Sequence, residues 1–372
     1  MIVNLYFIIT LICFVLTFFS YSQRKICCSI GKIKLYKNKW DFSNRLVFLV
    51  PMALVLILIT GLRNDMQTDY VTYDYIYSYY IKNLGILDLI KEREPIFAII
   101  EKVVGEISGY NIVVLMCVLA IITVVAMFIF LSKESEIVWL SVILTLTIGS
   151  YFTSFNTTRN YMSAAVFVLF SKYVYENKPV KYIITVVVLA LVHTSALALI
   201  PLYWLLRINW SAKGKKSLAL VFFAVYLMVF FGLESFLQFI HFRYMYLFSL
   251  SDWAGTSVVS SIRQIFILLI VLINRNMFSL EDMRHRMWMN ATIYLLAIQL
   301  LSTKYYLIYR YTYFLLPLAL LAIVHVISSC KSAKKKRFWT IIVLTFSLIW
   351  AAIGQFTMNY SFFWEENVNY FG

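Results

Sequence analysis

Long apolar segments recur along this chain, and short polar connections separate them. A transmembrane helix needs about 20 apolar residues, within a range of roughly 17–25. By that criterion the sequence predicts membrane spans at residues 2–21, 46–61, 111–131, 137–153, 160–175, 217–233, 257–274, 287–303, 311–329 and 338–354. Hydrophobic residues make up 62% of the 372 residues, whereas soluble domains contain about 45–50%. We therefore predict an all-α, polytopic integral membrane protein with about 10–12 transmembrane helices.

The polar connections differ sharply in charge. Lys and Arg gather in four of them, at Arg24–Arg45, Arg207–Lys216, Arg275–Arg286 and Lys331–Arg337. The positive-inside rule places these four connections in the cytoplasm. The net charge of +15 is then mainly a topology signal, with contact to anionic membrane lipid, and we expect no nucleic-acid partner. We predict one transmembrane domain, residues 1–372, with segments 62–94 and 234–256 as insertions on the outer side.

Two further segments do not fit a simple span. Residues 95–109 start with Pro95 and show an apolar stripe at Ile96, Ile100, Val103, Val104 and Ile107, with the charged residues Glu101, Lys102 and Glu106 opposite. Such an amphipathic helix can lie at the membrane interface or enter the bundle. Residues 182–206 are apolar but carry His193 at their centre. They form either one tilted helix or two half-helices that meet at His193. The charge rule favours the half-helices, with neither segment crossing the membrane.

The outer segment 62–94 is rich in carboxylates and tyrosines, unlike the rest of the chain. Its carboxylates, Asp69 and Glu94 among them, can hydrogen-bond to sugar hydroxyls or accept a proton. Tyrosine offers an apolar face with a polar end, which suits a sugar ring. The candidate sugar-binding residues are Asp65, Tyr70, Tyr73 and, in a later segment, Asn156. The alternative is an aromatic belt at headgroup depth beside a solvated acidic loop.

Three arginines on the predicted outer side are candidates for binding an anion. They are Arg63, Arg159 at the start of an apolar span, and Arg310 within a run of tyrosines. Guanidinium matches phosphate oxygens in a two-pronged arrangement, so the expected ligand group is a diphosphate. The alternatives are that Arg159 extends toward the lipid headgroups and that Arg310 anchors the interface.

His193 is the third candidate proton acceptor, beside Asp69 and Glu94. A neutral imidazole in an apolar segment can take a proton from an acceptor hydroxyl; a buried structural histidine is the alternative. His325, within a predicted span, is better explained as structural. The sequence contains no Walker A motif, no Gly-rich dinucleotide loop, no HExxH and no Cys-x-x-Cys pair. We therefore expect neither a cofactor nor a metal.

The ordered motifs resemble those of the EpsG-like exopolysaccharide polymerases, which are related in role to Wzy-type O-antigen polymerases. The resemblance extends from about residue 46 to 320 and is carried by Gly61-Leu62-Arg63, Thr68-Asp69-Tyr70 with Tyr73, Glu94-Pro95-x-Phe97, Phe155-Asn156-x-x-Arg159, His193-Thr194-Ser195-Ala196-Leu197 with Pro201, and Tyr309-Arg310 with Tyr313. Two positions depart from the family's pattern: Asn160 stands where the family often has Gln, and the Asn64-Asp65 pair varies.

This resemblance implies a multi-pass enzyme of the bacterial cytoplasmic (inner) membrane. It would polymerise undecaprenyl-pyrophosphate-linked oligosaccharide units on the periplasmic or outer face, by glycosyl transfer, for exopolysaccharide, capsule or O-antigen. Chain-length regulators and flippase proteins are expected partners. Two rival functions remain open from the residues alone. A flippase or transporter of lipid-linked oligosaccharide would also need cations, although it would need no proton acceptor. A membrane acyltransferase would have to rely on His325.

Overall fold

The structure is a computed structural model that describes residues 40–63, 68–149, 151–210 and 255–355. These residues form helices and no strand occurs among them, so the predicted all-α fold is confirmed. The predicted spans 2–21 and 217–233, most of the outer segment 234–256, and the candidate residue Asp65 lie outside the described residues.

The described residues fall into two compact units. The first takes its residues from Met1–Tyr173, Lys178–Ile200 and Cys330–Gly372, and the second from Val174–Asn177 and Pro201–Ser329. Each unit therefore contains chain segments that are far apart in the sequence. The single-domain organisation expected from the sequence stays a prediction.

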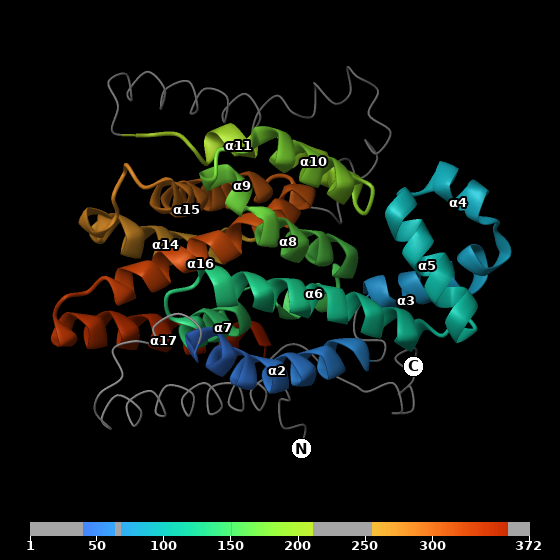
Figure 1. Ribbon diagram of the computed structural model, residues 1–372, viewed down its shortest axis with the longest axis horizontal. Helices are drawn as coiled ribbons and strands as arrows, with labels where there is room; N and C mark the ends of the chain where they lie inside the picture. Colours follow the sequence, from blue (N-terminus) through green and yellow to red (C-terminus); the bar gives the residue numbers. More distant parts are fainter. Residues whose placement is uncertain (1–39, 64–67, 150, 211–254, 356–372) are drawn as a thin grey trace. The chain divides into compact units, whose positions relative to one another are not determined.

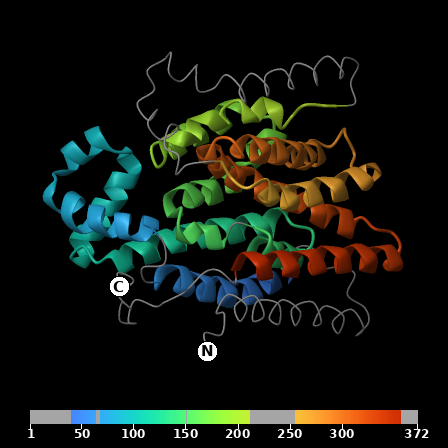
Figure 2. The ribbon, with the colours of Figure 1, turned by 180° about the vertical axis from the view of Figure 1, so that it is seen from behind.

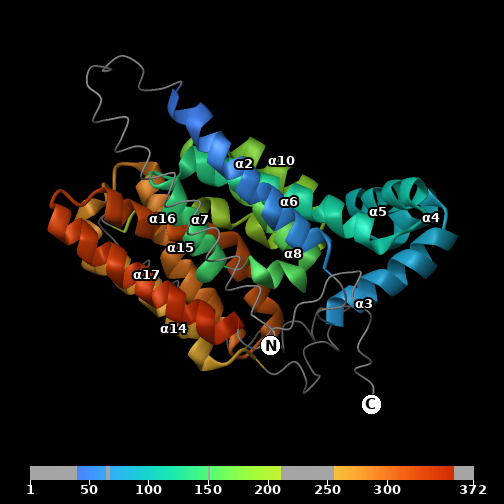
Figure 3. The ribbon, with the colours of Figure 1, turned by 90° about the horizontal axis from the view of Figure 1, so that it is seen from below.

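Three helices form the centre of the first unit: α2 (Trp40–Gly61), α6 (Ile112–Glu134) and α8 (Thr158–Phe170). Helix α6 packs against α2 on one side and α8 on the other, and Figure 3 shows α2 running along α6. The last residue of α2, Gly61, makes the close approach possible. A Cβ at Gly61 would lie 2.6 Å from the Cys117 Sγ atom, which is much closer than van der Waals contact allows.

Residues 68–108 fold as four short helices: α3 (Thr68–Tyr75), the π-helix η1 (Ile76–Ile81), α4 (Ile86–Glu92) and α5 (Pro95–Ser108). Figures 1 and 2 show them gathered at the start of α6. They share an apolar core with α6, formed by residues that include Tyr77, Leu89, Phe97 and Leu115. Helix α5 begins at Pro95, whose missing N–H is not needed in the first turn, and stops at Gly109, whose φ of 66° is left-handed.

The segment 160–206 contains a break at the predicted place. After α8 and the short α9 (Lys172–Tyr175), helix α10 covers Pro179–Ala190 and ends three residues before His193. His193 itself is extended, and the 3-10 helix η3 (Thr194–Leu199) follows. The Tyr182 hydroxyl donates a 2.7 Å hydrogen bond to the Leu199 carbonyl, which folds η3 back onto α10. The two half-helices expected around His193 are therefore present.

The remaining helices complete the two units. In the first unit α7 (Val138–Thr147) packs against α17 (Ala333–Gln355), and η2 (Phe152–Phe155) precedes α8. In the second unit α15 (Met283–Ser302) packs against α14 (Ile262–Ile273) and the deeply buried α16 (Thr312–Ser328). The short helices of this unit are α11 (Leu202–Leu205), η5 (Val258–Ser261), η6 (Arg275–Met277) and η7 (Tyr306–Tyr311).

Three of the described helical segments are long and apolar enough to cross a membrane: Ile112–Glu134, Tyr306–Ser328 and Ala333–Ile353. Five shorter apolar helices accompany them, among them Leu49–Gly61 and the two half-helices on either side of His193. Helix α17 exposes large apolar side chains such as Phe338, Ile341 and Ile353, as a surface in contact with lipid would. The chain is therefore a membrane protein. Helix α5 is not among the segments with the length and composition of a span.

Candidate active site

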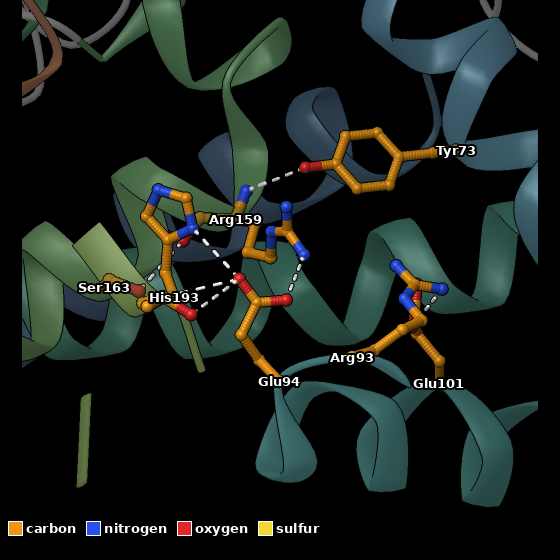
Figure 4. Close-up of polar contacts among 8 residues, drawn as sticks. Tyr73, Arg93, Glu94, Glu101, Arg159, Ser163 and His193 are labelled. Carbon is orange, nitrogen blue, oxygen red and sulfur yellow. Dashed lines mark hydrogen bonds and ion pairs between the residues drawn. The ribbon is translucent and has the colours of Figure 1, made fainter. Parts of the chain in front are cut away.

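The Arg159–Glu94 ion pair is the centre of the candidate site (Figure 4). Arg159 lies in the first turn of α8, and Glu94 is the residue just before α5. The Arg159 Nη1 atom is 2.9 Å from the Glu94 Oε2 atom, and the two side chains are 25% and 18% exposed. The sequence predicted these residues for two different roles, and the structure brings them into direct contact. Because Arg159 stays partly exposed, its guanidinium can reach an anionic ligand.

His193 approaches the other oxygen of the same carboxylate. Its Nδ1 atom lies 3.8 Å from Glu94 Oε1, and the Thr194 N–H and hydroxyl are each 3.4 Å from that oxygen. The break after α10 makes this approach possible, because in a continuous helix the Thr194 N–H would be bonded to the Ala190 carbonyl and could not face Glu94. The Ile96 N–H donates a 2.9 Å hydrogen bond to the Leu191 carbonyl, so the start of α5 is attached directly to the break.

The pKa of Glu94 indicates whether this carboxylate can act as a general base. Burial alone would raise the pKa of Glu94, but the nearby His193 imidazole and the Arg159 charge outweigh it and lower the pKa to about 2. A general base works best when its pKa lies near the operating pH. Glu94 is therefore a poor proton acceptor at neutral pH. As a permanent carboxylate it can orient an imidazole and stabilise the imidazolium that forms.

Residues of α3 and the segment before α8 lie against the start of α8. The Arg159 backbone N–H donates a 3.4 Å hydrogen bond to the Tyr73 hydroxyl, and the Asp69 N–H donates one of 3.3 Å to Asn156 Oδ1. Burial raises the pKa of Tyr73, so its hydroxyl keeps its proton. The Arg159 guanidinium also lies over the Phe97 ring, at 5.2 Å from the centroid. Of the predicted sugar-site and base residues, Tyr73 thus contacts Arg159, and Asp69 is bonded to Asn156.

Arg63 is built into the protein interior. Its side chain is only 1% exposed, and its guanidinium donates hydrogen bonds to the Thr60 carbonyl and, at 2.8 Å, to the Thr158 hydroxyl. It lies between the rings of Tyr70 and Phe155, at 5.9 and 5.4 Å from their centroids. Arg63 thus fastens the end of α2 to the start of α8. Diphosphate binding by Arg63 stays a prediction.

Arg310 belongs to the second unit, where it occupies the last turn of η7. The neighbouring rings of Tyr306 and Tyr309 stack at 6.4 Å between centroids. The convergence of Arg310 with Arg63 and Arg159 on one ligand stays a prediction. His325 is also in this unit, where its Nε2 atom lies 3.1 Å from the Met277 carbonyl oxygen, in line with the structural role expected of it.

The predicted face of α5 is wrong. The apolar stripe predicted that Glu101 lies on the exposed, polar face of the helix. In the structure Glu101 is buried, while Val103 and Ile107, which belong to the stripe, are exposed. The buried face of α5 carries Phe97, Ala98, Glu101 and Gly105. Hydrophobic periodicity missed this because a carboxylate counts as polar unless its partner is known. The partner is Arg93, whose Nη1 atom is 3.0 Å from Glu101 Oε2.

The described residues contain no group of three or more His, Cys, Asp or Glu side chains that could hold a metal ion. The first unit brings together a partly exposed guanidinium, an ionised carboxylate and an imidazole. Groups of these kinds can bind an anion and transfer a proton.

The fold and the site define a helical membrane protein with a charged site formed by the start of α5, the start of α8 and the break after α10. The chain belongs to the EpsG family, whose family model matches residues 46–370. EpsG is a Wzy-like polymerase family, so a general role of the polysaccharide-polymerase type is supported. No curated protein and no solved structure matches the chain.

Proposed function

We propose that this protein polymerises undecaprenyl-pyrophosphate-linked oligosaccharide units on the outer face of the bacterial cytoplasmic membrane. The observation that carries the proposal is the Glu94 carboxylate held between Arg159 and His193, at 2.9 and 3.8 Å. A glycosyl transfer from a lipid diphosphate needs a cation at the leaving group and a proton acceptor at the attacking hydroxyl. These side chains supply both in one place.

In the proposed reaction the acceptor sugar hydroxyl attacks the anomeric carbon of the donor chain. The new C–O bond forms as the bond from that carbon to the diphosphate oxygen breaks, and the diphosphate leaves with the bonding pair. His193 takes the hydroxyl proton, and the Glu94 carboxylate, 3.8 Å from His193 Nδ1, stabilises the imidazolium. Arg159 neutralises the charge that develops on the leaving diphosphate.

The cation is expected to contribute the larger share of the rate enhancement. Removing one preorganised donor from a developing oxyanion costs about 10²–10³ in rate in other enzymes. Asp69, Tyr70, Tyr73 and Asn156 are the proposed sugar contacts. The apolar helices beside the site offer the polyprenyl tail a lipid-like surface.

A cellular experiment separates polymerase from flippase. Cells that express Arg159→Ala in place of the wild type should display single-unit glycan at the surface and no long chains. Lys172→Ala is the matched control, because Lys172 follows α8, contacts the Tyr173 ring and lies outside the site. It should give normal chains. Long chains in the Arg159→Ala cells, or units trapped on the cytoplasmic side in cells that lack the protein, would overturn the proposal.

A further inference from the structure

A second ion pair lies one residue away from the candidate site. Arg93 immediately precedes Glu94, and its Nη1 atom is 3.0 Å from the Oε2 atom of Glu101, two turns along α5 (Figure 4). The Glu101 side chain is 1% exposed. The pair thus links Arg93, the residue before Glu94, to the buried face of α5.

Burying this pair is costly, so its presence requires a reason. Glu101 shares the buried face of α5 with Phe97 and Ala98, both members of the apolar cluster with Leu115 and Leu119. Taking two charges out of water is repaid by their attraction only in good geometry, and apolar replacements are often as stable. A buried pair of this kind is better explained by the geometry that it imposes than by stability.

The ion pair fixes the backbone turn between α4 and α5, where Arg93 and Glu94 lie. Arg93 is extended, with φ −133° and ψ 174°, and Glu94 follows with φ −63° and ψ 117°. The Arg93 N–H donates a 2.9 Å hydrogen bond to the Leu89 carbonyl, which ends α4. The side chain of Arg93 is then held by α5 through Glu101. Backbone and side chain together fix the residue from which the Glu94 carboxylate projects.

We propose that the Arg93–Glu101 ion pair is a positioning device that holds the Glu94 carboxylate between Arg159 and His193. Both residues are positioning residues, because they act on the reacting groups through Glu94. The kinetic part of this inference rests on the proposed function, whereas the structural part does not.

The charged and titratable groups that act on Glu101 are Arg93, Arg159, Glu94, Tyr73 and Tyr77. Burial raises the pKa of Glu101 to about 7, although the charges of Arg93 and Arg159 oppose the rise. Acidification through this range therefore neutralises Glu101 and leaves the Arg93 charge without its partner. Because the folded-state pKa lies above the ordinary value of 4.5, protonation favours the folded state. Activity should thus fall on acidification while the fold is not weakened at Glu101.

Glu101→Gln tests the device, with Glu106→Gln as the matched control. Glu106 is on the same helix but exposed, and it pairs with Lys102 at 3.1 Å. The first readout is the NMR signal of the His193 ring in purified, histidine-labelled protein, assigned by its loss in His193→Ala. Glu94→Gln supplies the shift expected when the carboxylate is lost. Glu101→Gln should move the His193 signal in the same direction, and Glu106→Gln should leave it in place.

The second readout is chain extension by the purified protein. Misplacement of a reacting group by about 1 Å can cost about a hundredfold in rate, so Glu101→Gln should lose roughly ten- to a hundredfold. An unchanged His193 signal in Glu101→Gln overturns the positioning role. Wild-type protein that extends no lipid-linked glycan overturns the proposed function, and the His193 signal still decides the positioning role.

If Glu101→Gln fails to fold, a variant with the two charges exchanged provides a second test. The double variant Arg93→Glu with Glu101→Arg keeps one positive and one negative charge at the same two places. It should restore folded protein and return the His193 signal to its wild-type position. A folded double variant with a displaced His193 signal contradicts the proposal.

Discussion

Glu94→Gln tests the electrostatic core of the site. The substitution keeps the size of the side chain and removes its charge, so Arg159 and His193 lose the carboxylate that both approach. The pKa of Glu94 is lowered from 4.5 to about 2 in the folded protein, with burial opposing the fall and His193 and Arg159 causing it. That difference corresponds to a free energy of about 3 kcal/mol, since one pKa unit is about 1.4 kcal/mol.

The sign of the pH dependence follows from the lowered pKa. The carboxylate stabilises the folded protein above about pH 4.5, and this stabilisation is lost as the pH falls from 4.5 toward 2. Wild type and Glu94→Gln should therefore differ in their unfolding free energy at pH 7. The difference should shrink at more acidic pH, where the wild-type carboxylate becomes protonated.

The assay measures the melting temperature of the purified protein in detergent. Samples are heated to a series of temperatures, and the protein that remains folded is quantified by size-exclusion chromatography. At pH 7 the Glu94→Gln variant should melt a few degrees below wild type, by about 1 °C for each kcal/mol in a chain of 372 residues. The control is Glu106→Gln, which removes an exposed carboxylate from α5, the helix that follows Glu94. Equal melting temperatures for wild type and Glu94→Gln at pH 7 would refute the reasoning, as would a difference that grows as the pH falls from 4.5 toward 2.

Three further substitutions separate structural from reactive roles. Arg63→Ala removes a buried side chain that holds several partners, so it should lower the unfolding free energy by about 3 kcal/mol and reduce the yield of folded protein; a normal yield with lost activity would point instead to a ligand role. Gly61→Ala places a Cβ 2.6 Å from Cys117 Sγ and should cost about 1–3 kcal/mol in melting experiments, part of which Cys117→Ala should restore. Thr194→Val keeps the N–H contact to Glu94 and loses only the 3.4 Å hydroxyl contact, so chain extension should fall less than about threefold; a larger loss would make the hydroxyl a substrate contact.

The fold class was accessible from the sequence because bilayer physics leaves little choice. Long apolar segments in a lipid environment must satisfy their backbone groups internally, which favours helices. The break at His193 was also predictable, since the charge rule and a central polar residue favoured two half-helices there. The family resemblance was confirmed by the match over residues 46–370.

The arrangement of the site was not accessible in the same way. The sequence offered Glu94, Arg159 and His193 as separate candidates, and only tertiary packing shows that one carboxylate joins the other two. Glu101 was assigned to the wrong face of α5 because its burial depends on Arg93, a partner that periodicity does not reveal. Similarly, the sequence does not show how exposed each arginine side chain is. In the structure Arg63 is buried, whereas Arg159 is partly exposed.

Extension of a purified undecaprenyl-pyrophosphate-linked repeat unit by the purified protein tests the central claim most directly. Wild type and Lys172→Ala should produce a ladder of glycans that increase by one repeat unit at a time. Arg159→Ala and His193→Ala should leave the repeat unit unextended. An undiminished ladder from Arg159→Ala or His193→Ala, or no extension by wild type, would contradict the account.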